Sequence, residues 1–270
     1  MKNKVIKLSV LSLVLTTGLT LAPASYADNC NTPAYKALQK VKDPGVISHI
    51  NEVNFTAAQK DKFQAMKKNF DAENKKTADA AKAMFLLVNQ LITSPTIDEA
   101  RLDSIVSDMK KSIVINQVQM ATFRHDLYNL LNDQQKTKYH ELQQQERQSI
   151  RMGIECPNLQ IYPDQFDQIK KLNLTAEQKA KIMPLISAAQ DQERKTILQS
   201  IDSPMSLEQI ETQIVQSTSP IDSEKLNAIA MAIAESQGEI TKNRVKAYHD
   251  IYQDLNEQQK AQFMKITSMQ

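Results

Sequence analysis

The chain has 270 residues, a formal net charge of +2, 24% charged residues, four glycines and no tryptophan. A charge so close to zero is not typical of a nucleic-acid-binding protein, and so few glycines leave no glycine-rich phosphate loop or dinucleotide-binding fingerprint. Scarce glycine and abundant helix-forming residues favour an all-α chain, long enough for one elongated domain or two small ones.

Residues 1–27 have the pattern of an export signal. Three lysines precede an apolar stretch, residues 8–21, which is shorter than the roughly 20 residues that a membrane-spanning helix needs. A small-x-small cleavage site ends at Ala27, so we expect cleavage after this residue. Cleavage removes three lysines and changes the net charge from +2 to −1. We therefore expect a periplasmic protein with no stable membrane insertion and no nucleic-acid partner.

The first half, residues 28–152, is predicted to be helical throughout most of its length. After a short amphipathic segment at 46–53, a long helix is expected over 56–92, ended by Thr93-Ser94-Pro95. The next helix, 98–131, has apolar residues three and four positions apart, which indicates helix-on-helix packing, with a polar gap at Asn116. A third helix is expected over 134–151.

A linker at 153–163 separates this half from the second, residues 164–270. Helices are expected over 175–200, where Pro184 would introduce a kink, then over 207–216, 222–254 and 257–270. Gly238 falls in the middle of the longest of these, and we expect a local weak point there because glycine disfavours helix interiors.

The pattern apolar–Thr/Asn–x–x–Gln occurs four times, at matched spacings in the two halves. Its copies are Phe55, Thr56 and Gln59; Leu131, Asn132 and Gln135; Leu174, Thr175 and Gln178; and Leu255, Asn256 and Gln259. Each copy is a capping box that predicts a helix start, because the Thr or Asn side chain accepts from a first-turn N–H and the Gln side chain bonds the cap's own N–H. The usual partner position for a hydrophobic staple holds lysine, so the leading Phe or Leu is expected to pack against another helix.

A tandem duplication is indicated by the sequences around these motifs. The stretch from His125 to Lys136 matches the stretch from His249 to Lys260 at a constant offset of 124 residues. A Thr-Ser-Pro sequence at 93–95 is echoed at 218–220. Internal repeats of this kind mean that the two halves should share one architecture.

Two cysteines, Cys30 and Cys156, occupy similar places in the two halves. In an exported protein they predict one intramolecular disulfide, with free thiols or an intermolecular bridge as the alternatives. His125 and His249 are equivalent, and each is followed by Asp, so a metal or acid/base site is conceivable. Without a supporting His or carboxylate pattern, the favoured interpretation is a polar position near a helix C-terminus.

No nucleophile–base constellation is visible, so neither an enzyme nor a cofactor is expected. The acidic residues are scattered among lysines at helical spacing, which usually marks a solvated face. The high methionine content suits a surface that accepts many partners, but core filling is the more common use of a methionine.

With these motifs, the chain resembles the Spy/CpxP periplasmic stress proteins, which carry two LTxxQ-type motifs. LTAEQ at 174–178 matches fully, FTAAQ at 55–59 differs in its first residue, and the other two copies have Asn in place of Thr. The resemblance implies a curved homodimer of helices that holds unfolded clients without ATP. Because both halves lie on one chain, it implies an intrachain pseudo-dimer packed about a local two-fold axis.

Two functions follow from this resemblance as expectations. The first is a periplasmic holdase whose partners are unfolded or partly folded proteins. The alternative is an envelope-stress regulatory or metal-sensing module that docks on a sensor protein. The near-neutral mature chain differs from the basic cradle of the family chaperone. Only the capping motifs align, so the resemblance leaves the client-binding residues unknown.

Overall fold

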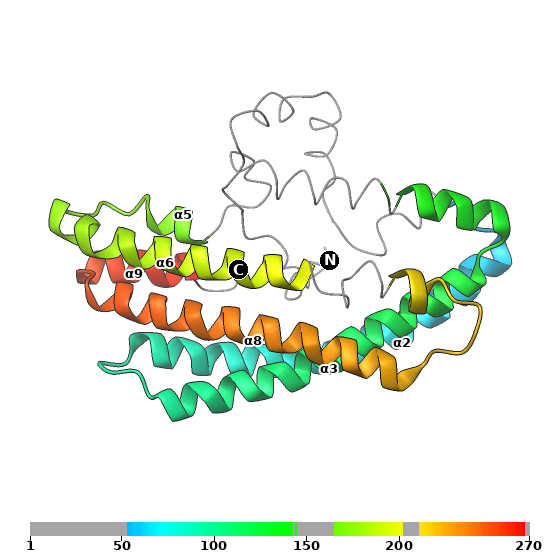
Figure 1. Ribbon diagram of the computed structural model, residues 1–270, viewed down its shortest axis with the longest axis horizontal. Helices are drawn as coiled ribbons and strands as arrows, with labels where there is room; N and C mark the ends of the chain where they lie inside the picture. Colours follow the sequence, from blue (N-terminus) through cyan, green and yellow to red (C-terminus); the bar gives the residue numbers. More distant parts are fainter. Residues whose placement is uncertain (1–52, 143, 145–164, 202–210, 268–270) are drawn as a thin grey trace, which may run out of the picture.

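The computed structural model describes residues 53–142, 144, 165–201 and 211–267, and these residues form helices and connecting turns with no strand among them (Figure 1). Four long helices dominate this part of the chain: α2 (Ala57–Thr93), α3 (Glu99–Leu130), α6 (Ala176–Ile201) and α8 (Ser223–Gln253). The shorter ones are α5 (Gln165–Ile169), η4 (Glu211–Val215), α9 (Glu257–Thr267) and a helical segment at 133–142. The all-α prediction is confirmed.

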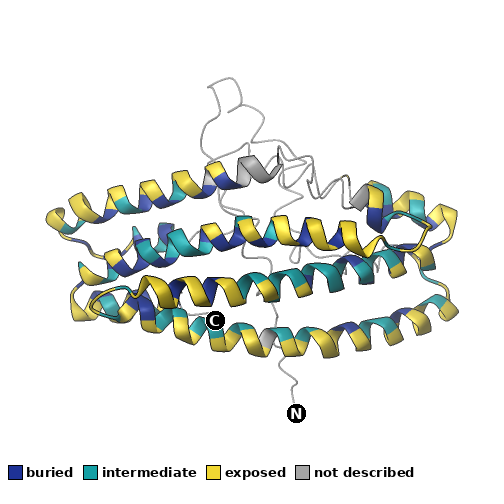
Figure 2. Ribbon diagram, turned by 60° about the horizontal axis from the view of Figure 1, so that its bottom comes forward, coloured by how far each residue is buried: buried dark blue, intermediate teal, exposed yellow. Residues whose placement is uncertain are grey.

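The long helices lie side by side, with α3 and α8 in the middle (Figure 2). α2 packs against α3 and also reaches α8, whereas α6 packs only against α8 among its stronger contacts. Three ion pairs between described residues of α3 and α8 give the direction of the pair: Glu99–Lys246 at 2.8 Å, Asp103–Lys242 at 2.5 Å and Lys110–Glu235 at 2.5 Å. Each step forward along α3 is a step backward along α8, so these two helices are antiparallel.

The largest buried cluster contains residues from both halves. Leu91 and Leu102 from the first half lie in one cluster with Phe166, Ile182 and Ile251 from the second, and each of these side chains is at most 2% exposed. Burying such side chains away from water is the main favourable term in folding. The halves therefore share a core, while the two-fold relation between them stays a prediction.

The helix ends follow from local sequence. Asp98 and Asp222 cap α3 and α8 by accepting from the N–H groups of Arg101 and Lys225, each at 3.0 Å. α2 ends where the Ser94 hydroxyl donates to the Leu91 carbonyl at 2.7 Å, directly before Pro95. These residues stabilise the N–H and C=O groups that a helix end leaves without intrahelical partners.

Some predicted elements differ in the structure. α5 was not expected, because its five residues are too few to show a helical period. α6 continues through Pro184, and the segment predicted over 207–216 contains a short π-helix, η4. The predictions for residues 1–27, 46–52, 143, 145–151, 153–163, 207–210, 268–270, Cys30 and Cys156 lie outside the described residues, so the disulfide stays a prediction.

Gly238 lies against the side chain of Lys110, which comes from α3. A Cβ atom at this position would lie 2.3 Å from Cε of Lys110, well inside van der Waals contact. At the expected weak point, the missing side chain leaves room for the Lys110 stem, whose ammonium group pairs with Glu235.

None of the helices in the described segments is both long enough and apolar enough to cross a membrane.

Candidate functional site

The two motifs of the first half meet at one end of the molecule, where the start of α2 lies beside the helical segment at 133–142 (Figure 1). The side-chain amides of Gln59 and Gln135 bond reciprocally. Gln59 Nε2 donates to Gln135 Oε1 at 2.8 Å, and Gln135 Nε2 donates to Gln59 Oε1 at 2.9 Å. We call such a reciprocal pair, together with its two capping boxes, a glutamine clasp.

Each glutamine of this clasp also binds backbone. Gln59 Oε1 accepts from Thr56 N–H at 3.0 Å, and Gln59 Nε2 donates to the Leu130 carbonyl at 2.8 Å. Gln135 accepts from Asn132 N–H at 3.0 Å and donates to the Asn54 carbonyl at 3.1 Å. The capping side chains complete the boxes, with Thr56 Oγ1 and Asn132 Oδ1 accepting from the N–H groups of their glutamines at 3.3 and 2.9 Å. Both capping boxes predicted for this half are confirmed.

The second half repeats this clasp at the opposite end of the molecule (Figure 1). Gln178 and Gln259 exchange bonds of 2.8 and 3.0 Å, and they donate to the carbonyls of Asp254 and Asn173 at 2.8 and 2.7 Å. The boxes formed with Thr175 and Asn256 are also present. All four motif copies are therefore used in the same way, as joints between two helix starts.

Burial makes these joints strong. Gln135 and Gln259 are only 7% and 4% exposed, and an amide buried without partners would destabilise the fold by about 1–3 kcal/mol. Asn54 has φ of 54°, a left-handed conformation that Asn tolerates better than most residues. The carbonyl of this strained residue is the one that accepts from Gln135.

Lysines at the predicted staple positions have a repeated role. Lys136 Nζ lies 4.9 Å from the centre of the Tyr128 ring, and Lys260 Nζ lies 5.2 Å from that of Tyr252. These two pairs are equivalent at the offset of 124 residues, and each places a cation over the face of an aromatic ring. A cation–π contact thus replaces the hydrophobic staple at the second motif of each half.

The leading apolar residues pack as expected. Leu131, Leu174 and Leu255 are buried in clusters that include other helices. Phe55 is half-buried, and its ring lies 5.7 Å from that of Phe63 in α2.

The two repeated histidines lie near opposite ends of the α3–α8 pair, and each contacts the other half. His125 Nε2 lies 3.0 Å from the Ser219 carbonyl, and His249 Nδ1 lies 3.2 Å from the Leu91 carbonyl. One helical turn further on, Asn129 donates to the Ser217 carbonyl at 3.3 Å, and Gln253 donates to the Ser94 carbonyl at 2.8 Å. α3 and α8 thus each form hydrogen bonds with the opposite half, at or beside its Thr-Ser-Pro turn.

This arrangement gives the histidines an architectural role. No group of three or more His, Cys, Asp or Glu side chains suited to a metal ion occurs within the described ranges. The interpretation of His125 and His249 as polar positions near helix C-termini agrees with their contacts to backbone carbonyls.

A buried ion pair joins α6 to α8, and it corrects the expectation that the acidic residues lie on solvated faces. The Glu193 side chain is 1% exposed, and both of its oxygens accept from the Arg244 guanidinium, whose NH2 group lies 2.9 Å away. The guanidinium also lies over the Phe166 ring, 5.6 Å from its centre. At the equivalent level of the first half, the polar gap Asn116 is buried and donates to Asn74 at 3.3 Å.

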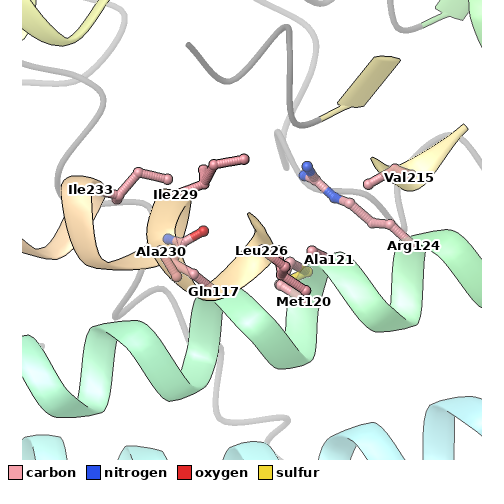
Figure 3. Close-up of a pocket in the computed structure, with 9 residues that line it drawn as sticks. All are labelled: Gln117, Met120, Ala121, Arg124, Val215, Leu226, Ile229, Ala230 and Ile233. Atoms are coloured by element: carbon pink, nitrogen blue, oxygen red, sulfur yellow. The ribbon is translucent and has the colours of Figure 1, made fainter. Parts of the chain in front are cut away.

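A small cavity lies between α3, η4 and α8, and Figure 3 shows the side chains around it. Its lining is mostly apolar, with Arg124 and Gln117 as the polar members: Gln117, Met120, Ala121, Arg124, Val215, Leu226, Ile229, Ala230 and Ile233. The cavity volume is about 20 Å³, enough for a water molecule but not for a metabolite.

Large apolar side chains are exposed along the middle helices and their neighbours. Leu86 is 63% exposed on α2, Ile115 is 53% exposed on α3, Met183 is 40% exposed on α6 and Met231 is 59% exposed on α8. The sequence did not identify these residues, because periodicity shows which residues suit a core but not which of them remain uncovered after packing.

Comparison with known proteins places the chain in a family. No curated protein and no solved structure matched it. The model of the LTXXQ motif family matches twice, over residues 45–143 and 163–267, and so covers most of the chain. The two matches agree with the tandem duplication and with the resemblance to Spy/CpxP proteins. With its four motif copies joined as two clasps, the chain belongs to the LTXXQ motif family as a tandem duplicate.

Proposed function

We propose that this protein is an exported, ATP-independent chaperone that holds partly unfolded proteins on the exposed faces of its long helices. The observation that carries the proposal is the set of exposed apolar side chains, one or more on each of the four long helices described: Leu86, Leu87, Ile115, Met183 and Met231. Membership of a family similar to Spy/CpxP supports an exported, protein-binding role over a metabolic one.

An exposed lysine lies near each of three of these apolar side chains. Lys82, Lys111 and Lys179 lie four residues before Leu86, Ile115 and Met183 and are exposed. Residues four apart share one face of a helix, so an ammonium group flanks each apolar side chain. Such a surface can contact apolar segments and acidic flanks of many unrelated chains, because neither contact demands precise geometry.

The cavity is consistent with a surface-binding role. With a volume of about 20 Å³, it offers no room for a nucleotide or other small-molecule ligand. We place client binding on the outer helix faces, where the exposed apolar side chains lie, and expect release when the client buries its own apolar residues.

We expect the purified mature protein to suppress the aggregation of two unrelated clients, reduced α-lactalbumin and chemically denatured lactate dehydrogenase, in a light-scattering assay without ATP. A variant with Leu86→Ser, Ile115→Ser and Met231→Ser should lose most of this activity while its circular dichroism and thermal unfolding stay unchanged. A matched control changes exposed polar residues of the same helices, Lys75→Ser, Ser107→Ala and Glu239→Ser, and should remain active.

No suppression of either client at several-fold molar excess would contradict the proposal. The regulatory alternative, docking on a sensor protein, would then be the better hypothesis. Equal activity of the apolar variant and the control would show that clients bind elsewhere.

A further inference from the structure

We propose that the contact between α3 and α8, here called the seam, is selective. Its pattern of charge and shape favours pairing of the first half with the second and disfavours pairing of like halves from two copies. The problem arises from the duplication. α3 and α8 are equivalent helices at an offset of 124 residues, so two chains could also associate through α3–α3 and α8–α8 contacts in the same antiparallel register. A selective seam removes this alternative.

The charges of the seam are complementary only between unlike helices. Glu99, Asp103 and Lys110 of α3 form ion pairs with Lys246, Lys242 and Glu235 of α8, respectively. The bonded Lys242 ammonium lowers the pKa of the Asp103 carboxyl, and Asp103 in turn raises the pKa of Lys242. The two groups therefore favour each other's charged forms.

Like-with-like pairing loses these contacts. The equivalents of Lys242 and Glu235 in α3 are Val118 and Lys111, so an α3–α3 contact would place Asp103 against Val118 and Lys110 against Lys111. One ion pair becomes an unpaired charge and another becomes a repulsion.

An α8–α8 contact would also lose ion pairs of the seam. The equivalents of Asp103 and Lys110 in α8 are Asn227 and Ala234, which would leave Lys242 and Glu235 without an opposite charge. Specificity is a difference between affinities, so contacts absent from the wrong pair count as much as those present in the right one.

Shape adds to the charge pattern at one of the same residues, Lys110. Gly238 leaves the space that the Lys110 stem occupies, and its equivalent in α3 is Val114. In an α3–α3 contact, Lys110 would therefore meet a branched side chain where the seam has none. In an α8–α8 contact, Ala234 would stand in place of Lys110 over Gly238 and leave a void. Overlap and voids both destabilise a packed contact.

The test inverts two seam pairs in the full mature chain without changing net charge. Asp103→Lys with Lys110→Glu places like charges against Lys242 and Glu235. At low ionic strength, we expect this variant to unfold at a temperature about 5 °C lower than the parent and to populate dimers or larger species in size-exclusion chromatography with light scattering. Adding Glu235→Lys and Lys242→Glu restores opposite charges and should return both properties to those of the parent.

A control away from the seam keeps the result interpretable. Glu73→Lys with Lys76→Glu inverts an exposed pair within α2, at 2.8 Å, that belongs to neither seam helix. This control should keep the size of the parent and a nearly unchanged unfolding temperature. The proposal is overturned if the seam variant behaves like the control, or if the fourfold variant fails to recover; recovery is decisive even where the twofold variant does not fold.

Discussion

Replacing Arg244 with methionine is expected to lower the free energy of unfolding by about 3–5 kcal/mol, because the Glu193 carboxylate would stay buried without its bidentate partner. The Phe166 ring would also lose the cation over its face. Methionine is the informative substitution, since Met120 occupies the equivalent position of the first half. Urea unfolding followed by circular dichroism measures the change.

A double variant separates the lost pair from a simple packing defect. Glu193→Leu combined with Arg244→Met removes both charges, and replacing a buried ion pair by apolar side chains is often neutral or stabilising. We expect the double variant to recover most of the stability. If Arg244→Met alone costs less than about 1 kcal/mol, the pair is not the buried contact described above.

Gln259→Ala is expected to destabilise the protein by about 2–4 kcal/mol. The substitution removes both bonds with Gln178, the bond to the Asn173 carbonyl and one member of the capping box. The amide of Gln178 would then keep only part of its partners in a largely buried setting. The same urea titration measures the loss.

The neighbouring glutamine provides the control. Gln258 is exposed, so Gln258→Ala should change the free energy of unfolding by less than about 0.5 kcal/mol. In a double-mutant cycle, Gln178→Ala and Gln259→Ala should couple by about 1–3 kcal/mol, because the two side chains contact each other directly. Additive effects would mean that the two motifs stabilise their helices separately.

The helix starts could be predicted from the sequence because capping is local. Thr56 and Gln59 are three residues apart, and their bonds form within one helical turn. The clasp could not be predicted in the same way. The second partner of Gln59 is Gln135, 76 residues away, and only the packing of two helix starts brings their amides together.

The sequence also does not show which polar residues are buried. Glu193 has the same helical spacing among charged residues as exposed glutamates, and only the approach of Arg244 and α5 identifies it as a core residue. Gly238 is a position where the sequence predicts local weakness, because glycine disfavours a helix interior. The structure shows that the Lys110 stem fills the space that a Cβ atom would have occupied there.

The duplication could be predicted from the sequence, whereas the way in which the two halves join could not. The offset between His125 and His249 predicts equivalent helices, but it does not show that each histidine contacts the opposite half. Those contacts depend on the antiparallel seam, which sets the end of one long helix beside the turn of the other half.

The central claim is that two sequence repeats form one cooperative unit around a shared core. Differential scanning calorimetry of the mature protein tests it most directly. We predict a single transition whose calorimetric enthalpy equals its van't Hoff enthalpy, because Leu91, Leu102 and Ile251 belong to the same buried cluster. Two separate transitions, with the van't Hoff enthalpy near half of the calorimetric value, would show that the repeats unfold independently and would contradict this account.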